Sequence, residues 1–200
     1  MNFLTEFEGS PGLLGKLADL AVAREHREIN AWVISLLNLQ PRDRVLEIGF
    51  GPGLALGKVS QLLPDGFIAG ITSSEPLLHR VRARNRAAVQ AARMDLRLAT
   101  ARALPYTDQS FDKAFSIDSI NACLDPTYDL IEIKRVLRKD GLLAVAWDPS
   151  HMDCAPGPAY TPEEVIKLFI DAGWSRVVRH ELGSRFCVMG VKRISEGHLS

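Results

Sequence analysis

The feature that most constrains this chain is a short apolar run, RVLEIGF at residues 44–50, that leads into three glycines at positions 49, 51 and 53. A short apolar run that meets a glycine cluster is typical of a buried strand. Residues 54–63 then show apolar positions at helical spacing, and Pro64-Asp65-Gly66 is a turn signal. A strand, a glycine-rich turn and a helix in this order predict the start of an open, doubly wound α/β sheet.

The rest of the chain continues the alternation. We predict further strands at 67–72, 95–99, 111–117 and 142–147, a long helix at 76–92, and a helix at 127–138 with its stop at Lys139-Asp140-Gly141. Alternating strands and helices predict a parallel sheet with helices on both faces.

The two ends of the chain add elements of their own. Residues 13–22 and 26–39 have apolar positions at helical spacing, and Pro41 breaks the second of these helices. Near the other end, Thr161, Pro162 and Glu164 form a capping-box pattern that starts a helix. Gly183-Ser184 then separates two strand-like halves, 175–182 and 185–191, which predicts a hairpin. The expected fold is a mostly parallel, seven-stranded sheet with an antiparallel C-terminal hairpin.

Length and composition indicate one globular domain. The chain has 200 residues, with 46% apolar and 24% charged residues, which is ordinary globular composition. We expect a single domain over 1–200, with an N-terminal helical cap over 1–40 and an α/β core over 41–200. Lys plus Arg and Asp plus Glu are both 24, so charge gives no reason to expect a nucleic-acid partner. No apolar run reaches the roughly 20 residues of a membrane span.

Cysteine usage and the first ten residues bear on location. Residues 1–10 include Glu6 and Glu8 and no basic residue, which is unlike a signal or transit peptide. The cysteines, Cys123, Cys154 and Cys187, are odd in number and widely spaced. This pattern favours a reduced, cytoplasmic chain without a metal site.

The glycine-rich turn is the strongest candidate ligand site. Glycines allow a tight turn and a close approach of the backbone to a ligand, with a helix N-terminus facing it. The alternative is a tight turn that binds nothing. The third glycine of a dinucleotide fingerprint falls at position 54, which is Leu, and this counts against a nicotinamide-dependent dehydrogenase.

At this level of detail the sequence resembles a known family. VLEIGFGPG (45–53) is similar to the first motif of the class I S-adenosylmethionine-dependent methyltransferases, which have a Rossmann-like fold. The similarity includes ALPYTDQSFDKAFS (103–116) and IEIKRVLRKDGLLAVAWDP (131–149). It covers roughly residues 10–192 and favours the small bacterial members, of the methyltransferase type 11 kind.

The resemblance implies a cofactor, S-adenosylmethionine, and roles for several residues. Gly49, Gly51 and Gly53 would border its methionine and ribose parts. Glu47 would contact the methionine ammonium, directly or through water; the alternative is that Glu47 only caps amides of the turn. Ser116, Ile117 and Asp118 would lie along the methionine moiety.

The sequence departs from the family at two anchor points. Members usually have an acidic residue at the end of the second strand, which binds both ribose hydroxyls, whereas this chain has Thr72 followed by Ser73. Glu75 is the nearest acid, either as a ribose ligand or as a helix-capping residue. The acid near the adenine amino group is also replaced, because Thr100 and Ala101 stand there. A hydroxyl can still make one hydrogen bond where a carboxylate makes two.

The expected function is methyl transfer from S-adenosylmethionine to a small molecule. The alternative is a methyltransferase-like binding or regulatory protein with weak or no cofactor binding. No catalytic residue is assigned, since the methyl group is already activated and orientation supplies most of the catalysis. Asp118 and His151 are the candidate bases, and Trp147 and Tyr160 either line an acceptor pocket or pack.

Overall fold

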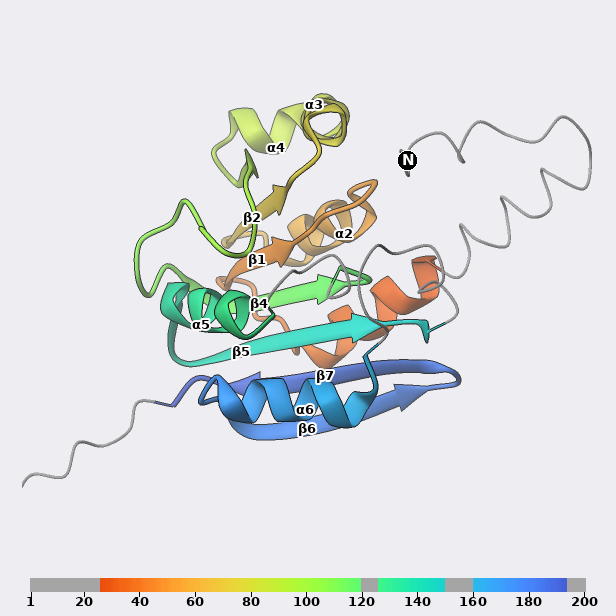
Figure 1. Ribbon diagram of the computed structural model, residues 1–200. Helices are drawn as coiled ribbons and strands as arrows, with labels where there is room; N and C mark the ends of the chain where they lie inside the picture. The colour runs from red at the N-terminus through yellow and green to blue at the C-terminus, as the bar shows by residue number, and fades with distance from the viewer. Residues whose placement is uncertain (1–25, 120–125, 150–159, 194–200) are drawn as a thin grey trace, which may run out of the picture.

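The computed structural model describes residues 26–119, 126–149 and 160–193. Within these ranges the strands form a seven-stranded sheet in the order β3-β2-β1-β4-β5-β7-β6 (Figure 1). The strands are β1 (Arg44–Ile48), β2 (Phe67–Thr72), β3 (Met94–Leu98), β4 (Phe111–Ile117), β5 (Leu137–Trp147), β6 (Ser175–Leu182) and β7 (Arg185–Val191).

Strand pairing confirms the predicted fold class. The first five strands pair in parallel with their neighbours, while β7 runs antiparallel to β5 and β6 antiparallel to β7. Gly183 and Ser184 lie between the two hairpin strands, as expected. The sheet is therefore doubly wound and mostly parallel, with an antiparallel hairpin at one end.

Helices cover both faces of the sheet (Figure 1). Residues 26–36, α2 (Leu54–Leu62) and α3 (Glu75–Arg84) contribute to one apolar cluster. The other cluster, on the opposite face, includes side chains of α5 (Pro126–Val136) and α6 (Pro162–Asp171). Because both faces are covered, the central strands read as nearly continuous apolar runs.

The capping-box prediction for α6 is confirmed. The Thr161 amide donates to Glu164 Oε2 at 2.8 Å, and the Glu164 amide donates to Thr161 Oγ1 at 3.3 Å. Pro162 occupies the first turn, where its missing N–H leaves no helical hydrogen bond unmade.

Two sequence predictions are wrong in detail. The helix expected over 76–92 is two helices, α3 and α4 (Arg86–Gln90), because the chain leaves helical geometry at Asn85, whose Nδ2 donates to the Val81 carbonyl. The stop expected at Lys139-Asp140-Gly141 lies inside β5, since the helix ends at Val136 and the strand begins at Leu137. A register shift against β4 accommodates these residues, with Asp140 at φ 59.

Part of the predicted N-terminal cap is described. The helix expected over 26–39 is helical over 26–36, and Asn38, at φ 48, follows it. Its buried residues pack against the sheet. The helix expected over 13–22, together with His151, Cys123 and Cys154, lies outside the described residues. In the part of the chain that is described, no helix is both long and apolar enough to span a membrane.

Candidate functional site

The strand order places a candidate site between β1 and β4. Successive connections run from β1 outward through β2 to β3, and then resume on the other side with β4. Crevices at the carboxyl ends of strands on either side of such a reversal bind ligands in open α/β sheets. The glycine-rich turn follows β1 at this point and leads into α2.

The three glycines of this turn differ in what they permit. A Cβ at Gly49 would lie 2.7 Å from Ser119 Cβ, and one at Gly53 would lie 2.6 Å from Val81 Cγ1. Both residues also have positive φ, 72 and 77, which disfavours a side chain. A Cβ at Gly51 would have no described atom within 4 Å. Gly49 and Gly53 are therefore needed to build the turn. Gly51 is not needed for this reason, and the space beside its Cα is open.

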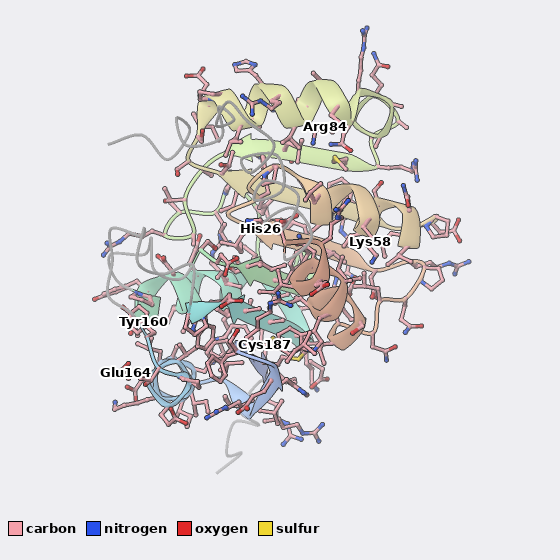
Figure 2. The ribbon with its side chains drawn as sticks, turned by 90° about the vertical axis from the view of Figure 1, so that its right-hand side faces the viewer. His26, Lys58, Arg84, Tyr160, Glu164 and Cys187 are labelled. Carbon is pink, nitrogen blue, oxygen red and sulfur yellow. The ribbon has the colours of Figure 1, made fainter. Side chains whose placement is uncertain are left out.

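Three hydrogen bonds, two to β2 and one from α3, hold the turn. The amides of Gly49 and Phe50 both donate to the Ile71 carbonyl of β2 at 3.0 Å. Arg84 of α3, labelled in Figure 2, donates through Nη1 to the Pro52 carbonyl at 3.1 Å. Because its own contacts fix this backbone, the turn is shaped before any ligand arrives.

Glu47, two residues before Gly49, is the most unusual side chain at the site. It is 6% exposed, and its Oε2 atom is buried with no hydrogen-bond partner in the described structure. Burial raises the pKa of its carboxyl group from 4.5 to about 8. The amides of Gly49 and Phe50 donate elsewhere, so the alternative in which Glu47 caps these amides is not observed. A buried carboxyl group in this position suits a cationic ligand group.

The end of β2 holds the residues predicted to meet the ribose. Thr72 is buried, and its Oγ1 accepts a hydrogen bond from the Ser74 amide at 3.2 Å, while Ser73 is exposed. Glu75 begins α3, is exposed, and lies 3.7 Å from His79 in an i,i+4 pair. The structure therefore favours the helix-terminal interpretation of Glu75.

The two residues predicted to lie near the adenine differ in burial. Thr100 is exposed and forms a bridge with Ala103, whereas Ala101 is buried. Ala101 lines an apolar cavity of about 30 Å³ beneath α5, together with Ile48 of β1 and Ser116 of β4.

The ends of β4 and β5 are joined by Asp118. Its Oδ1 accepts a hydrogen bond from the Asp148 amide at 2.9 Å, and its own amide donates to the Ala146 carbonyl. Asp118 has φ 54, and Ile117 before it is partly buried. The observed contacts give Asp118 a positioning role between the strands, and its role as a base remains a prediction.

Trp147 and Tyr160, the two aromatic residues considered for an acceptor pocket, differ in burial. Trp147 is fully buried at the end of β5, with its ring centroid 5.8 Å from that of Phe186. The packing interpretation of Trp147 is therefore correct. Tyr160 is partly buried and packs against the cluster under α6 (Figure 2).

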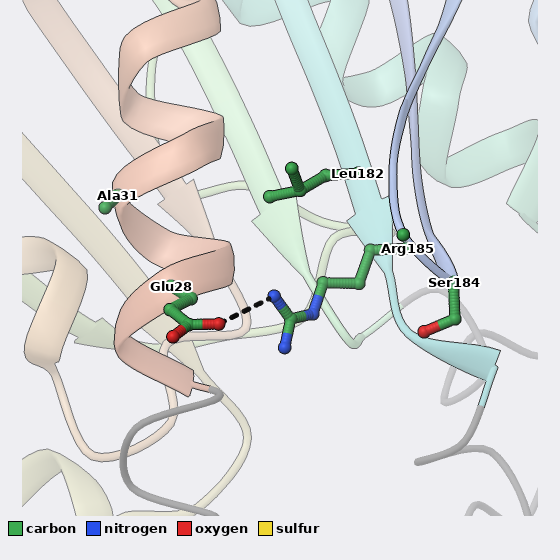
Figure 3. A pocket seen from close by; sticks show the side chains of 6 residues that line it. Glu28, Ala31, Leu182, Ser184 and Arg185 are labelled. Atoms are coloured by element: carbon green, nitrogen blue, oxygen red, sulfur yellow. Dashed lines mark hydrogen bonds and ion pairs between the residues drawn. The ribbon is translucent and has the colours of Figure 1, made fainter.

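Sequence reasoning missed an ion-pair chain at the same edge of the sheet. Arg185, at the start of β7, donates through Nε to Asp148 Oδ2 at 3.1 Å, and its Nη1 lies 3.4 Å from Glu28 Oε2 (Figure 3). Arg185 and Glu28 line a shallow cavity of about 580 Å³ with Leu182 and Ser184. Nothing in the sequence signals a contact between residues 157 positions apart, because it arises from β7 lying beside β5.

Comparison with known proteins identifies relatives of this chain. A family model described as a methyltransferase domain matches residues 46–145. An uncharacterized methyltransferase of Bacillus subtilis, YdaC, is 28% identical over 140 residues, which are 70% of this chain and 75% of that protein. Four proteins described as O-methyltransferases are longer, and the match spans 42–55% of each.

Solved structures share the fold. A structure described as a SAM-dependent methyltransferase from Aquifex aeolicus superposes with a TM-score of 0.71 at 24% identity, over 82% of this chain and 89% of that one. A putative methyltransferase of Haloferax volcanii, solved with the Trm112 methyltransferase activator, superposes with a TM-score of 0.75 at 18% identity, over 90% and 97% of the two chains.

Proposed function

Because the chain belongs to the methyltransferase domain family, whose model matches half of it, we propose that it transfers a methyl group from S-adenosylmethionine to a small-molecule acceptor. The family match confirms the class of enzyme and the type of cofactor predicted from the sequence. The acceptor and the residues that bind cofactor and acceptor are part of the proposal.

The observation that carries the proposal is the combination of Glu47, near the end of β1, with Gly51 on the turn that follows it. Gly51 leaves open space against a backbone that is already fixed, and Glu47 offers a buried carboxyl group without a partner in the described structure. S-Adenosylmethionine carries an ammonium and a sulfonium group, so it can supply a positively charged partner for the carboxyl group of Glu47. The residues present therefore fit this cofactor.

The chemistry requires orientation more than acid–base catalysis. When bound, S-adenosylmethionine supplies a methyl group already activated by its sulfonium. The protein's own contribution is to hold the two reactants in line and to exclude water. In this proposal Glu47 and the glycine turn hold the methionine part, Thr72 and Ser73 the ribose, and Thr100 and Ala101 lie beside the adenine, with Ile117 along the methionine chain.

A small acceptor suits the charge balance of the chain and the size of the cavity beside Arg185. We place its entry between residues 26–36 and the β5–β7 edge, where Arg185 joins Asp148 and Glu28. We propose no nucleic-acid or membrane partner. The cytoplasmic location inferred from the cysteines remains a prediction.

Titration calorimetry with S-adenosylmethionine and with its demethylated product, S-adenosylhomocysteine, tests the proposal. We expect both to bind with one site per chain. Absence of binding by either compound to the folded protein would contradict the proposal and favour the alternative, a methyltransferase-like protein that has lost its cofactor.

The substitution Thr72→Asp is expected to strengthen cofactor binding about tenfold, or about 1.4 kcal/mol. An aspartate can accept the hydrogen bond from the Ser74 amide with one oxygen and a hydrogen bond donated by a ribose hydroxyl with the other. Glu75→Gln serves as the matched control and should leave the affinity unchanged, since Glu75 is turned toward His79. Calorimetry on both variants checks this. A loss of affinity in Glu75→Gln, with no gain in Thr72→Asp, would assign the ribose to Glu75 instead.

A further inference from the structure

We propose that binding of the cofactor at the glycine turn releases a proton from Glu47, so that cofactor affinity rises with pH across the neutral range. This inference rests on the proposed function and concerns the regulation of the same site. It requires that Glu47 be protonated in the free protein and ionised in the complex.

The described residues that lie directly beside Glu47 in the sheet, and the side chains over its neighbour Gly70, are apolar. In β1, Val45 belongs to the cluster beneath α2, while Leu46 and Ile48 belong to the opposite cluster. Because side chains alternate along a strand, Glu47 points to the side of Val45. Its neighbours in the sheet are Gly70 of β2 and Phe115 of β4. The space over Gly70 is occupied by the side chains of Phe50, Leu56 and Leu96.

No charged group of the packed elements compensates Glu47. The buried Oε2 atom of Glu47 has no hydrogen-bond partner in the described structure, and burial is the cause of the raised pKa of its carboxyl group. The elements on this side carry the following titratable residues: His26, Arg27 and Glu28 of the N-terminal helix, Lys58 of α2, Glu75, His79, Arg80, Arg82 and Arg84 of α3, Arg86 of α4, Lys113 of β4, and Cys187 of β7. Lys113 is paired with Asp43, at 2.7 Å. The arginines of α3 that bond to described groups reach carbonyls, Arg82 that of Leu96 and Arg84 that of Pro52.

The protonation state follows from these contacts. With a pKa of about 8, the carboxyl group of Glu47 is neutral in the free protein at neutral pH. A cation placed beside it favours the ionised form and lowers its pKa. The ligand that brings this cation must then displace the proton, and binding becomes weaker as the pH falls below about 8.

The experiment uses S-adenosylhomocysteine, which keeps the ammonium group and lacks the sulfonium. Its affinity is measured by calorimetry between about pH 6 and about pH 8, in pairs of buffers with different ionisation enthalpies. We expect the affinity to rise close to tenfold per pH unit in this window, and close to one proton to be released on binding near pH 7.

Two variants identify the group that releases the proton. Glu47→Gln cannot ionise, so it should bind more weakly near pH 8, show no rise of affinity with pH, and release no proton. Glu75→Gln, at the exposed start of α3, should keep the wild-type pH dependence. Circular dichroism of each variant confirms that it is folded.

The outcomes separate this inference from the proposed function. Binding of S-adenosylhomocysteine without proton release, or with equal affinity at all pH values, would overturn the inference and leave the proposed function standing. Proton release that persists in Glu47→Gln would overturn it too, because another group would then be the source. Absence of binding at every pH would overturn both.

Discussion

Replacing Gly51 with Val is expected to weaken binding of S-adenosylmethionine at least about 100-fold, or about 2.7 kcal/mol, in a protein that stays folded. A side chain at this position meets no described atom within 4 Å, so the substitution costs the free protein little. The same side chain would occupy the space through which a ligand approaches the turn. Titration calorimetry measures the binding, and thermal unfolding measures the stability.

Gly53→Val is the matched control. Gly53 has φ 77, and its added Cβ would lie 2.6 Å from Val81 Cγ1. Positive φ and overpacking together should destabilise the protein by about 3 kcal/mol or more. The two variants therefore separate loss of binding from loss of folding. If Gly51→Val binds the cofactor with wild-type affinity, the turn is not the cofactor site.

Glu47→Gln should remove a pH dependence from the stability of the cofactor-free protein. The folded-state pKa of about 8 lies above the ordinary value of 4.5 for this carboxyl group, so the folded protein holds one more proton than the unfolded chain between these values. The wild-type free energy of unfolding therefore falls as the pH rises from about 4.5 to about 8, by up to about 5 kcal/mol, and is constant above that window. Glutamine does not titrate and should lack this decline.

Denaturant unfolding at about pH 5 and about pH 8 measures the effect. We expect the wild-type protein to lose several kcal/mol between the two conditions relative to Glu47→Gln, and saturating S-adenosylhomocysteine to restore part of that loss. If the free energy of unfolding changes equally with pH in the wild-type protein and in Glu47→Gln, Glu47 does not carry a raised pKa in the folded state.

The parts of the fold that could be predicted are those with a local signal. The strand at 67–72 and the strand at 111–117 have the bounds expected from their apolar runs. The capping-box pattern of Thr161 and Glu164 correctly predicted the start of α6. The break at Asn85 could not be predicted, because asparagine is tolerated in helices and the surrounding apolar spacing continues through it. The start of β5 at Leu137 depends on pairing with Phe111, which no local pattern contains.

The candidate site divides in the same way. Its glycine turn was predictable because the spacing of the glycines expresses a backbone requirement within a few residues. The differing roles of Gly49 and Gly51 were not, since they depend on Ser119, which follows the end of β4 and lies over Gly49. The contact between Arg185 and Asp148 also needs the strand order, in which the last strand lies beside β5.

The position of β7 has a consequence for the order in which the protein is completed during synthesis. Arg185 reaches Glu28 across 157 residues of chain, which a ribosome makes in roughly 10–30 s. During that interval the parallel strands and the glycine turn have all been made, whereas the contacts of Arg185 with Asp148 and Glu28 cannot yet exist. A nascent chain can thus shape its glycine turn well before the Arg185 contacts form. If the turn is the cofactor site, as we propose, a cofactor that binds early would stabilise the half that is already made.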